Sequence, residues 1–286
     1  MNVNCLIDNN LTNQAVPEEL NSDQATVLIA KRASQLVSKL IEHRGHDKPP
    51  FLPREFECLK SIKRITEENL GNTSAILLRF GDGYIIKVNR NQSQNRQHFS
   101  CAHEIGHILF DELELTNYIR TIEYRTFNPP AQVEARKFAR ERLCDVAAKE
   151  LLMPEAIFRK YLLGFGVSIN SIMLLSNVFK ASIPTVALRI EEVSPVPCVA
   201  FQWKLWRRRR SKALRLSWPR RKSHCIPMNT QAKSGSALFK AYETDSTVKC
   251  YKLFKLGTVV KRLPMESKGF GYGENRRVYS LAFLER

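Results

Sequence analysis

The sequence predicts an α+β protein in which a part mixing helices with a β-hairpin precedes a β-rich, basic part. Three observations support this prediction. Apolar residues recur at helical spacing over 25–43, as in an amphipathic helix. Two short β-branched and apolar runs, 73–79 and 84–89, flank Asp82-Gly83, a dipeptide that favours tight hairpin turns. After Pro195 apolar and basic residues alternate, as they do along strands with one buried face.

The other predicted elements lie between these landmarks. Short helices are expected over 55–69 and 99–110. A long helix over 131–152 follows two prolines and ends before Pro154. Two or three shorter helices are expected over 155–190. Strands are expected at 199–206, 213–218, 248–254, 258–263 and 277–283.

These elements divide the chain into four segments. Residues 1–22 are polar and aperiodic, and we expect them to form a poorly ordered lead-in. We expect a core domain at 23–154 and a small helical extension at 155–194. The rest, 195–286, is expected to be a basic β-rich domain with a sensory or binding role.

The net charge of +17 is concentrated in the C-terminal part of the chain. Residues 195–286 contain 21 Lys and Arg against 5 Asp and Glu, which gives +16. The first 194 residues contain 24 against 23, which gives +1. A near-neutral unit is therefore joined to a strongly basic one, for which nucleic acid and acidic proteins are the natural partners.

The sequence favours a cytoplasmic protein. It begins without the basic and apolar stretches of a signal peptide, and no window approaches the roughly 18 uncharged apolar residues that a membrane span needs. The seven cysteines are odd in number and never paired as Cys-x-x-Cys, so neither a disulfide framework nor a zinc knuckle is indicated. A second zinc site from Cys198, His224, Cys225 and Cys250 is less favoured than ordinary buried thiols, because their spacing is irregular.

The segment around His103, Glu104 and His107 has the pattern H-E-x-x-H. On a helix, residues four apart project from one face, so both imidazoles can hold a single zinc ion with the glutamate beside it. Three fixed residues are a modest signal. The apolar residues that follow allow one side of this helix to be buried, as a supported metal site requires.

A catalytic zinc usually has three protein ligands and one open position. Glu141 on the predicted long helix is the preferred third ligand. Asp145 lies one turn further on the same face and could accept the free N–H of a zinc-bound histidine, most simply His103. Glu134, two turns before Glu141, remains the main rival. Donors for an oxyanion are not identifiable: Tyr118, Tyr124 and His224 are candidates, and the role stays unassigned.

Two blocks of sequence together resemble the ImmA/IrrE family of metallopeptidases. They are residues 96–109 (RQHFSCAHEIGHIL) and residues 141–154 (ERLCDVAAKELLMP). The resemblance covers about 73–190 and implies a zincin-like metallopeptidase domain. It further implies that His103, His107 and Glu141 bind zinc and that Glu104 is the general base. Some relatives carry a sensory domain resembling GAF in the place of the basic segment.

The resemblance also implies a regulatory role. Family members cut, or otherwise inactivate, a helix-turn-helix repressor and thereby release stress-response or mobile-element genes. Residues 174–189 look like the helical segment that follows the family's catalytic core and is similar to a helix-turn-helix. Pro184 is a departure that would distort its second helix. Helices that merely complete the peptidase domain are an equally good interpretation.

The basic segment interleaves cations with Trp203, Trp206 and Trp218, which indicates contact with nucleic acid or another partner. A β-sheet with arginines outward and tryptophans inward explains the same alternation. The candidate binding residues are Arg207, Arg208, Arg209, Arg210, Arg220, Arg221 and Lys222.

Two functions from different classes thus compete. The leading one is a zinc-dependent regulatory endopeptidase that cleaves a helix-turn-helix repressor. The other is a DNA-binding or protein-binding regulator that keeps the zinc fold as a scaffold without proteolysis.

Overall fold

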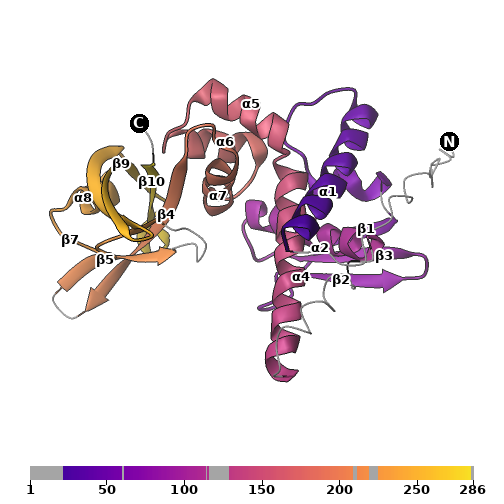
Figure 1. Cartoon of the computed structure of the whole chain (residues 1–286). Helices are drawn as coiled ribbons and strands as arrows, with labels where there is room; N and C mark the ends of the chain where they lie inside the picture. The colour runs from indigo at the N-terminus through magenta and orange to yellow at the C-terminus, as the bar shows by residue number, and fades with distance from the viewer. Residues whose placement is uncertain are drawn as a thin grey trace. The chain divides into compact units, whose positions relative to one another are not determined.

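The structure, a computed structural model, describes residues 22–59, 61–113, 115, 129–208, 211–218 and 225–284 (Figure 1). The chain divides into two compact units. The first contains the residues up to Ile157 together with Val178–Ala181, and the second contains Phe158–Asn177 and Ser182–Arg286. Residues 1–21 of the expected lead-in lie outside the described residues.

The first unit combines a small sheet with long helices. Its elements are α1 (Ser22–Arg44), η1 (Pro53–Leu59), β1 (Ile62–Glu68), β2 (Ala75–Phe80), β3 (Gly83–Asn89), α2 (Gln94–Glu112) and α4 (Pro129–Leu152). The predicted hairpin is confirmed as β2 and β3, and the helices predicted over 25–43, 99–110 and 131–152 are confirmed as α1, α2 and α4. The α+β fold class is therefore confirmed in this unit.

The helix predicted over 55–69 is wrong, because its second half is strand β1. This strand pairs in parallel with β3, which pairs antiparallel with β2, so the sheet order is β1-β3-β2. The pairing shifts register between Ile62 and Arg64, and Ile62 and Ile65 are both buried. The bulge thus places two residues three apart on one face, a spacing that imitates a helix.

Helix α4 packs against both α1 and α2 (Figure 1). The α2–α4 contact is closest at Gly106, where a Cβ atom would lie 2.9 Å from the backbone oxygen of Cys144 and 3.2 Å from Cβ of Ala147. The backbones of α2 and α4 are therefore in contact at this point, and a residue larger than glycine has no room at position 106. Ala147 and Ala148 are small and fully buried, which permits this close packing.

The second unit is a seven-stranded antiparallel sheet with helices. Its elements are most of α5 (Glu155–Phe165) and of α6 (Ser171–Phe179), then α7 (Ile183–Val193), β4 (Cys198–Arg208), β5 (Ser211–Trp218), β6 (Cys225–Pro227), β7 (Gln231–Lys233), α8 (Ala237–Glu243), β8 (Val248–Leu256), β9 (Val259–Phe270), η2 (Gly273–Asn275) and β10 (Arg277–Phe283). The strand order is β6-β8-β9-β10-β4-β5-β7. All five predicted strands are present, and β6, β7 and α8 were not predicted.

The two faces of this sheet are covered differently. On one face, Trp203, Phe254 and Val278 form a buried core with Leu238 and Phe239 of α8. On the other face, the carboxylate of Glu266 in β9 accepts a hydrogen bond from the backbone N–H of Ile169, and α7 packs against β4. Helices therefore cover part of both faces.

Helices α6 and α7 have the local geometry of a helix-turn-helix. They are bent by 109° across a short turn in which Lys180 has φ +50°. The expected distortion of this helix by Pro184 is wrong. Pro184 lies in the first turn of α7, where backbone nitrogens make no intrahelical hydrogen bond, so a proline costs none there. Ser182 caps the helix by accepting a hydrogen bond from the N–H of Thr185. The buried face of α7 includes Arg189, which favours a packing role for this helix.

Among the described helices, none alone has the length and apolar character of a membrane span. Taken together, α6 and α7 would pass the same test of length and composition.

The contact at Gly106 generates a prediction about stability. Gly106→Ala is expected to destabilise the protein by roughly 1–3 kcal/mol through overpacking against Cys144 and Ala147. Gly164→Ala in α5 is the matched control, because the added Cβ would meet nothing within 4 Å. This substitution is expected to stabilise the helix by about 0.5–1 kcal/mol. Urea unfolding followed by circular dichroism measures both. Equal stabilisation by the two alanines would contradict a close α2–α4 contact at this glycine.

Candidate metal centre

Helix α2 places His103 and His107 side by side on one face. Their ring centroids are 4.9 Å apart and the ring planes meet at 76°. The helix holds this orientation because Ile105 and Ile108, on its other side, are buried in the core of the unit. The two imidazoles themselves remain partly accessible, with 16% and 14% of their side-chain surface exposed. They can therefore meet a ligand from solvent.

Helix α4 brings a carboxylate to both histidines. Glu141 Oε2 lies 3.1 Å from Nε2 of His103, and Oε1 lies 3.8 Å from Nε2 of His107. The structure thus brings together the three residues that the sequence predicted as zinc ligands. Glu104, one position after His103 on α2, is partly buried beside them.

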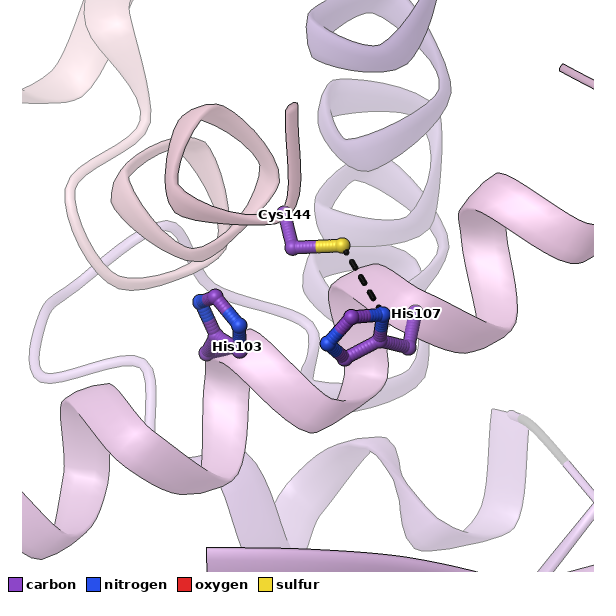
Figure 2. A group of neighbouring side chains, drawn as sticks. All are labelled: His103, His107 and Cys144. Carbon is purple, nitrogen blue, oxygen red and sulfur yellow. Dashed lines mark hydrogen bonds between the residues drawn. The ribbon is translucent and has the colours of Figure 1, made fainter. Parts of the chain in front are cut away.

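The second nitrogen of each imidazole has its own partner on α4. Asp145 Oδ1 lies 2.9 Å from Nδ1 of His103, as expected for a carboxylate that accepts this N–H. Cys144 Sγ lies 3.2 Å from Nδ1 of His107 (Figure 2). Neighbouring residues of one helix therefore contact the Nδ1 atoms of the two histidines and leave both Nε2 atoms directed at Glu141.

Two sets of three donors can be drawn from these residues, and they exclude each other. His103, His107 and Cys144 have donor atoms within 4.8 Å of one another, and so form one candidate set. Cys144, however, is on the Nδ1 side of His107, whereas Glu141 faces Nε2 of both rings. The two nitrogens of an imidazole point in diverging directions. An ion shared by both Nε2 atoms therefore has Glu141 as its third ligand. The Cys144 thiol then lies on the opposite, Nδ1 side of the His107 ring.

The spacing of the set that contains Glu141 fits a small divalent ion. A tetrahedral ion with bonds of about 2.0–2.1 Å keeps its ligand atoms roughly 3.3 Å apart. The two nitrogen–oxygen distances of 3.1 and 3.8 Å lie on either side of that value. The lone pairs of two neutral imidazoles point at the oxygens of one carboxylate. Because all of these atoms are hydrogen-bond acceptors, a cation or a proton must lie between them. The donor chemistry and the spacing both suit such a metal.

The surroundings of the site shift the pKa values of its residues in different directions. Burial lowers the pKa of His107 to about 4, with the neighbouring His103 and Arg140 acting in the same direction. Burial also lowers the pKa of His103, but the hydrogen bond to Asp145 and the surrounding carboxylates outweigh it and raise that pKa. Burial, aided by the Glu141 carboxylate, raises the pKa of Glu104. His107 is thus neutral near pH 7, as a metal ligand must be.

Several residues proposed from the sequence cannot be placed. The side chains of Glu134 and Arg208 lie outside the described part of the chain. The same holds for Tyr118, Tyr124, Arg209, Arg210, Arg220, Arg221, Lys222 and His224. Arg207 is exposed near the end of β4 in the second unit. The roles suggested for these residues therefore stay predictions.

Cys144 is the site residue whose role the sequence reasoning missed. No role was predicted for Cys144 from the sequence, and the structure buries it fully, which raises the pKa of its thiol. Its position offered a signal, because it lies three residues after Glu141 and immediately before Asp145, on the helix expected to complete the site.

Comparison with known proteins finds three similarities. Residues 60–191 match the family described as the IrrE N-terminal-like domain, a peptidase family. The radiation response metalloprotease IrrE of Deinococcus radiodurans is 30% identical over 116 residues, which are 40% of this chain and 33% of that protein. The chain thus matches about a third of the length of this curated relative. A Mycobacterium tuberculosis transcriptional regulator of known structure aligns with a TM-score of 0.57 at 13% identity, over 91% of this chain and 80% of that one, and shows a shared fold.

The contact of Cys144 with His107 generates a prediction about metal affinity. Cys144→Ala is expected to weaken binding of a divalent ion about tenfold, because His107 loses the partner of its Nδ1–H. Cys144→Ser should retain most of the affinity, since a hydroxyl oxygen also accepts this bond. Competition with a chromophoric chelator measures both. The matched control is Cys198→Ala, a buried cysteine of the second unit. Equal losses in all three variants would contradict the prediction.

Proposed function

We propose that the protein is a zinc-dependent endopeptidase, because residues 60–191 match the family of IrrE N-terminal-like domains. The observation that carries the proposal is the convergence of His103, His107 and Glu141, with Glu104 beside them. Zinc is the ion proposed because two imidazoles and one carboxylate with an open fourth position are typical of catalytic zinc. We place the protein in the cytoplasm, in keeping with seven cysteines that are odd in number and never paired as Cys-x-x-Cys.

Each residue of the site has a task in peptide hydrolysis. When bound, the ion supplies polarisation of the scissile carbonyl and a lowered pKa for the attacking water. Glu104 accepts the proton of that water and passes it to the leaving amine. Its raised pKa suits this double role, because a more basic carboxylate takes a proton more readily near neutrality. Asp145 and Cys144 hold the Nδ1 protons of the two histidines, which keeps both Nε2 lone pairs free.

The proposed substrate is a helix-turn-helix transcriptional repressor, and its cleavage would release stress-response or mobile-element genes. Support comes from the relative in Deinococcus radiodurans, which is named a radiation response metalloprotease. The site is also accessible enough for a protein segment, since the side chains of Glu141 and Asp145 are 45% and 51% exposed. Regulatory proteolysis is therefore the function that the site supports best.

A second candidate is a regulator that binds DNA or protein and keeps the metal fold as a scaffold. The charge of +16 on residues 195–286 favours it, as does a fold shared with a protein described as a transcriptional regulator. Binding of DNA that weakens steeply with salt and is indifferent to Glu104→Gln would support this candidate.

The peptidase proposal predicts different results for two variants of α2. Glu104→Gln is expected to keep the metal and to lower cleavage by roughly a hundred- to ten-thousand-fold, because the proton acceptor is lost. His103→Ala is expected to lose both metal and cleavage. The substrate tested is the helix-turn-helix repressor encoded nearest to this chain, and mass spectrometry of its fragments is the readout. Undiminished cleavage by purified Glu104→Gln protein would refute the assignment of Glu104.

The third ligand is tested on α4. Glu141→Gln is expected to lower zinc affinity at least about tenfold, since the neutral amide is a poor substitute for a carboxylate. Glu134→Gln, two turns earlier on the same helix, is the matched control and is expected to keep wild-type affinity. The reverse pattern would transfer the ligand role to Glu134.

A further inference from the structure

The second unit has an exposed apolar strip on one edge of its large sheet. Strand β8 alternates strictly, so that Phe254 is buried against the core of α8 while Tyr251 and Leu253 point the other way. On that outer face the exposed fractions are 64% for Tyr251 and 51% for Leu253. Ile226, Met228 and Val260 add 46%, 57% and 48%. We call these five residues the outer strip.

Strand register makes the strip continuous. Ile226 of β6 is paired with Lys255 of β8, which is paired in turn with Val260 of β9. The next row is formed by Met228, whose N–H donates to the carbonyl of Leu253. Neighbouring side chains on one face of a sheet lie about 4.5–5.5 Å apart between Cβ atoms, so the five apolar groups form one patch. Patches of this kind mark interaction sites more often than isolated exposed residues do.

The outer strip lies next to a part of the same sheet face that is buried by other residues of the unit. Further along the sheet, Glu266 of β9 is paired with Leu281 of β10, and both are buried. The Glu266 carboxylate accepts the N–H of Ile169 there. Among the residues that the structure describes, the sheet face is thus protected over β10 and open over β6, β8 and the first half of β9. An apolar surface left open beside a covered one is a candidate for a partner.

Positively charged side chains lie within the strip and beside it. Lys249 and Lys255 are exposed on the outer face of β8. Arg262 of β9 is exposed and lies with its guanidinium 5.3 Å from the centre of the Tyr251 ring. Glu266 is the one carboxylate in β6, β8 and β9; 7% of its side chain is exposed, and it lies 3.4 Å from Nζ of Lys249 and offsets the charge of that lysine. Lys255, between Ile226 and Val260, and Arg262, paired with Leu253, therefore give the strip a positive charge.

We propose that the outer strip is the docking surface for an acidic segment of a partner protein that carries apolar side chains. Its tyrosine, methionine and neighbouring arginine are residue types enriched at protein–protein interfaces, and Lys255 and Arg262 favour an acidic partner. Single-stranded nucleic acid is the less suitable occupant, because four of the five strip residues are aliphatic and offer no stacking surface. A second copy of this chain is also a less suitable occupant, because two basic faces repel each other. The proposal does not depend on peptidase activity.

The test uses a fluorescein-labelled peptide of alternating leucine and glutamate with the full chain, read by fluorescence anisotropy. Saturable binding is expected, and peptides of alternating serine and glutamate or of leucine and lysine should bind at least about tenfold more weakly. Leu253→Ser and Arg262→Glu should each weaken binding of the leucine–glutamate peptide about tenfold. Each variant is accepted only if its thermal unfolding matches the wild type.

Matched controls come from exposed residues of the same unit outside the strip. Leu163→Ser in α5, where the leucine is 59% exposed, and Lys240→Glu in α8 should leave affinity unchanged. The proposal is overturned if the leucine–glutamate peptide fails to bind, or if Leu163→Ser lowers its affinity as much as Leu253→Ser does. Equally tight binding of an oligothymidylate of the same charge that is insensitive to Leu253→Ser would overturn it in favour of nucleic acid.

Discussion

The candidate site depends on the close approach of α2 and α4 at Gly106. Because this residue has no side chain, its helix can lie against the backbone of Cys144 and the methyl group of Ala147. Glu141, one turn before Cys144, then reaches both histidines, and Asp145, the next residue, reaches His103. A wider helix separation would leave the imidazole pair without the carboxylates. The donor geometry is therefore a consequence of packing as well as of the ligands themselves.

The Nδ1 atoms of His103 and His107 contact different chemical groups. A carboxylate contacts Nδ1 of His103, whereas a buried thiol contacts Nδ1 of His107. A carboxylate is the stronger acceptor and increases the basicity of the ring it contacts. The pKa of His103 is accordingly raised while that of His107 is lowered. The second imidazole is thus kept neutral and oriented at Nδ1 without an added negative charge.

Local patterns predicted most of the fold, and long-range pairing explains the failures. Apolar residues at helical spacing located α1, and the prolines at its two ends located α4. Strand β1 was mistaken for a helix because its bulge spaces Ile62 and Ile65 three apart, and only pairing with β3 makes it a strand. Strands β6 and β7 have three residues each and are defined by their neighbours. No pattern within so short a run could identify them.

The same distinction applies to the site. His103 and His107 could be found because their spacing is local, and Glu141 because a helix face can be projected from the sequence. That Cys144 contacts His107 depends on how one helix is rotated against another, which no single-helix pattern contains. The outer strip likewise required the register of three strands, because its members are scattered between Ile226 and Val260.

The most direct test of the proposed zinc site is X-ray absorption at the zinc edge on metal-loaded, full-length protein. We predict one ion per chain with only nitrogen and oxygen neighbours at about 2.0–2.1 Å, including two imidazoles. A sulfur neighbour at about 2.3 Å would make Cys144 a ligand and contradict coordination by Glu141 and the two Nε2 atoms. Failure of the pure protein to bind zinc at all would contradict it equally.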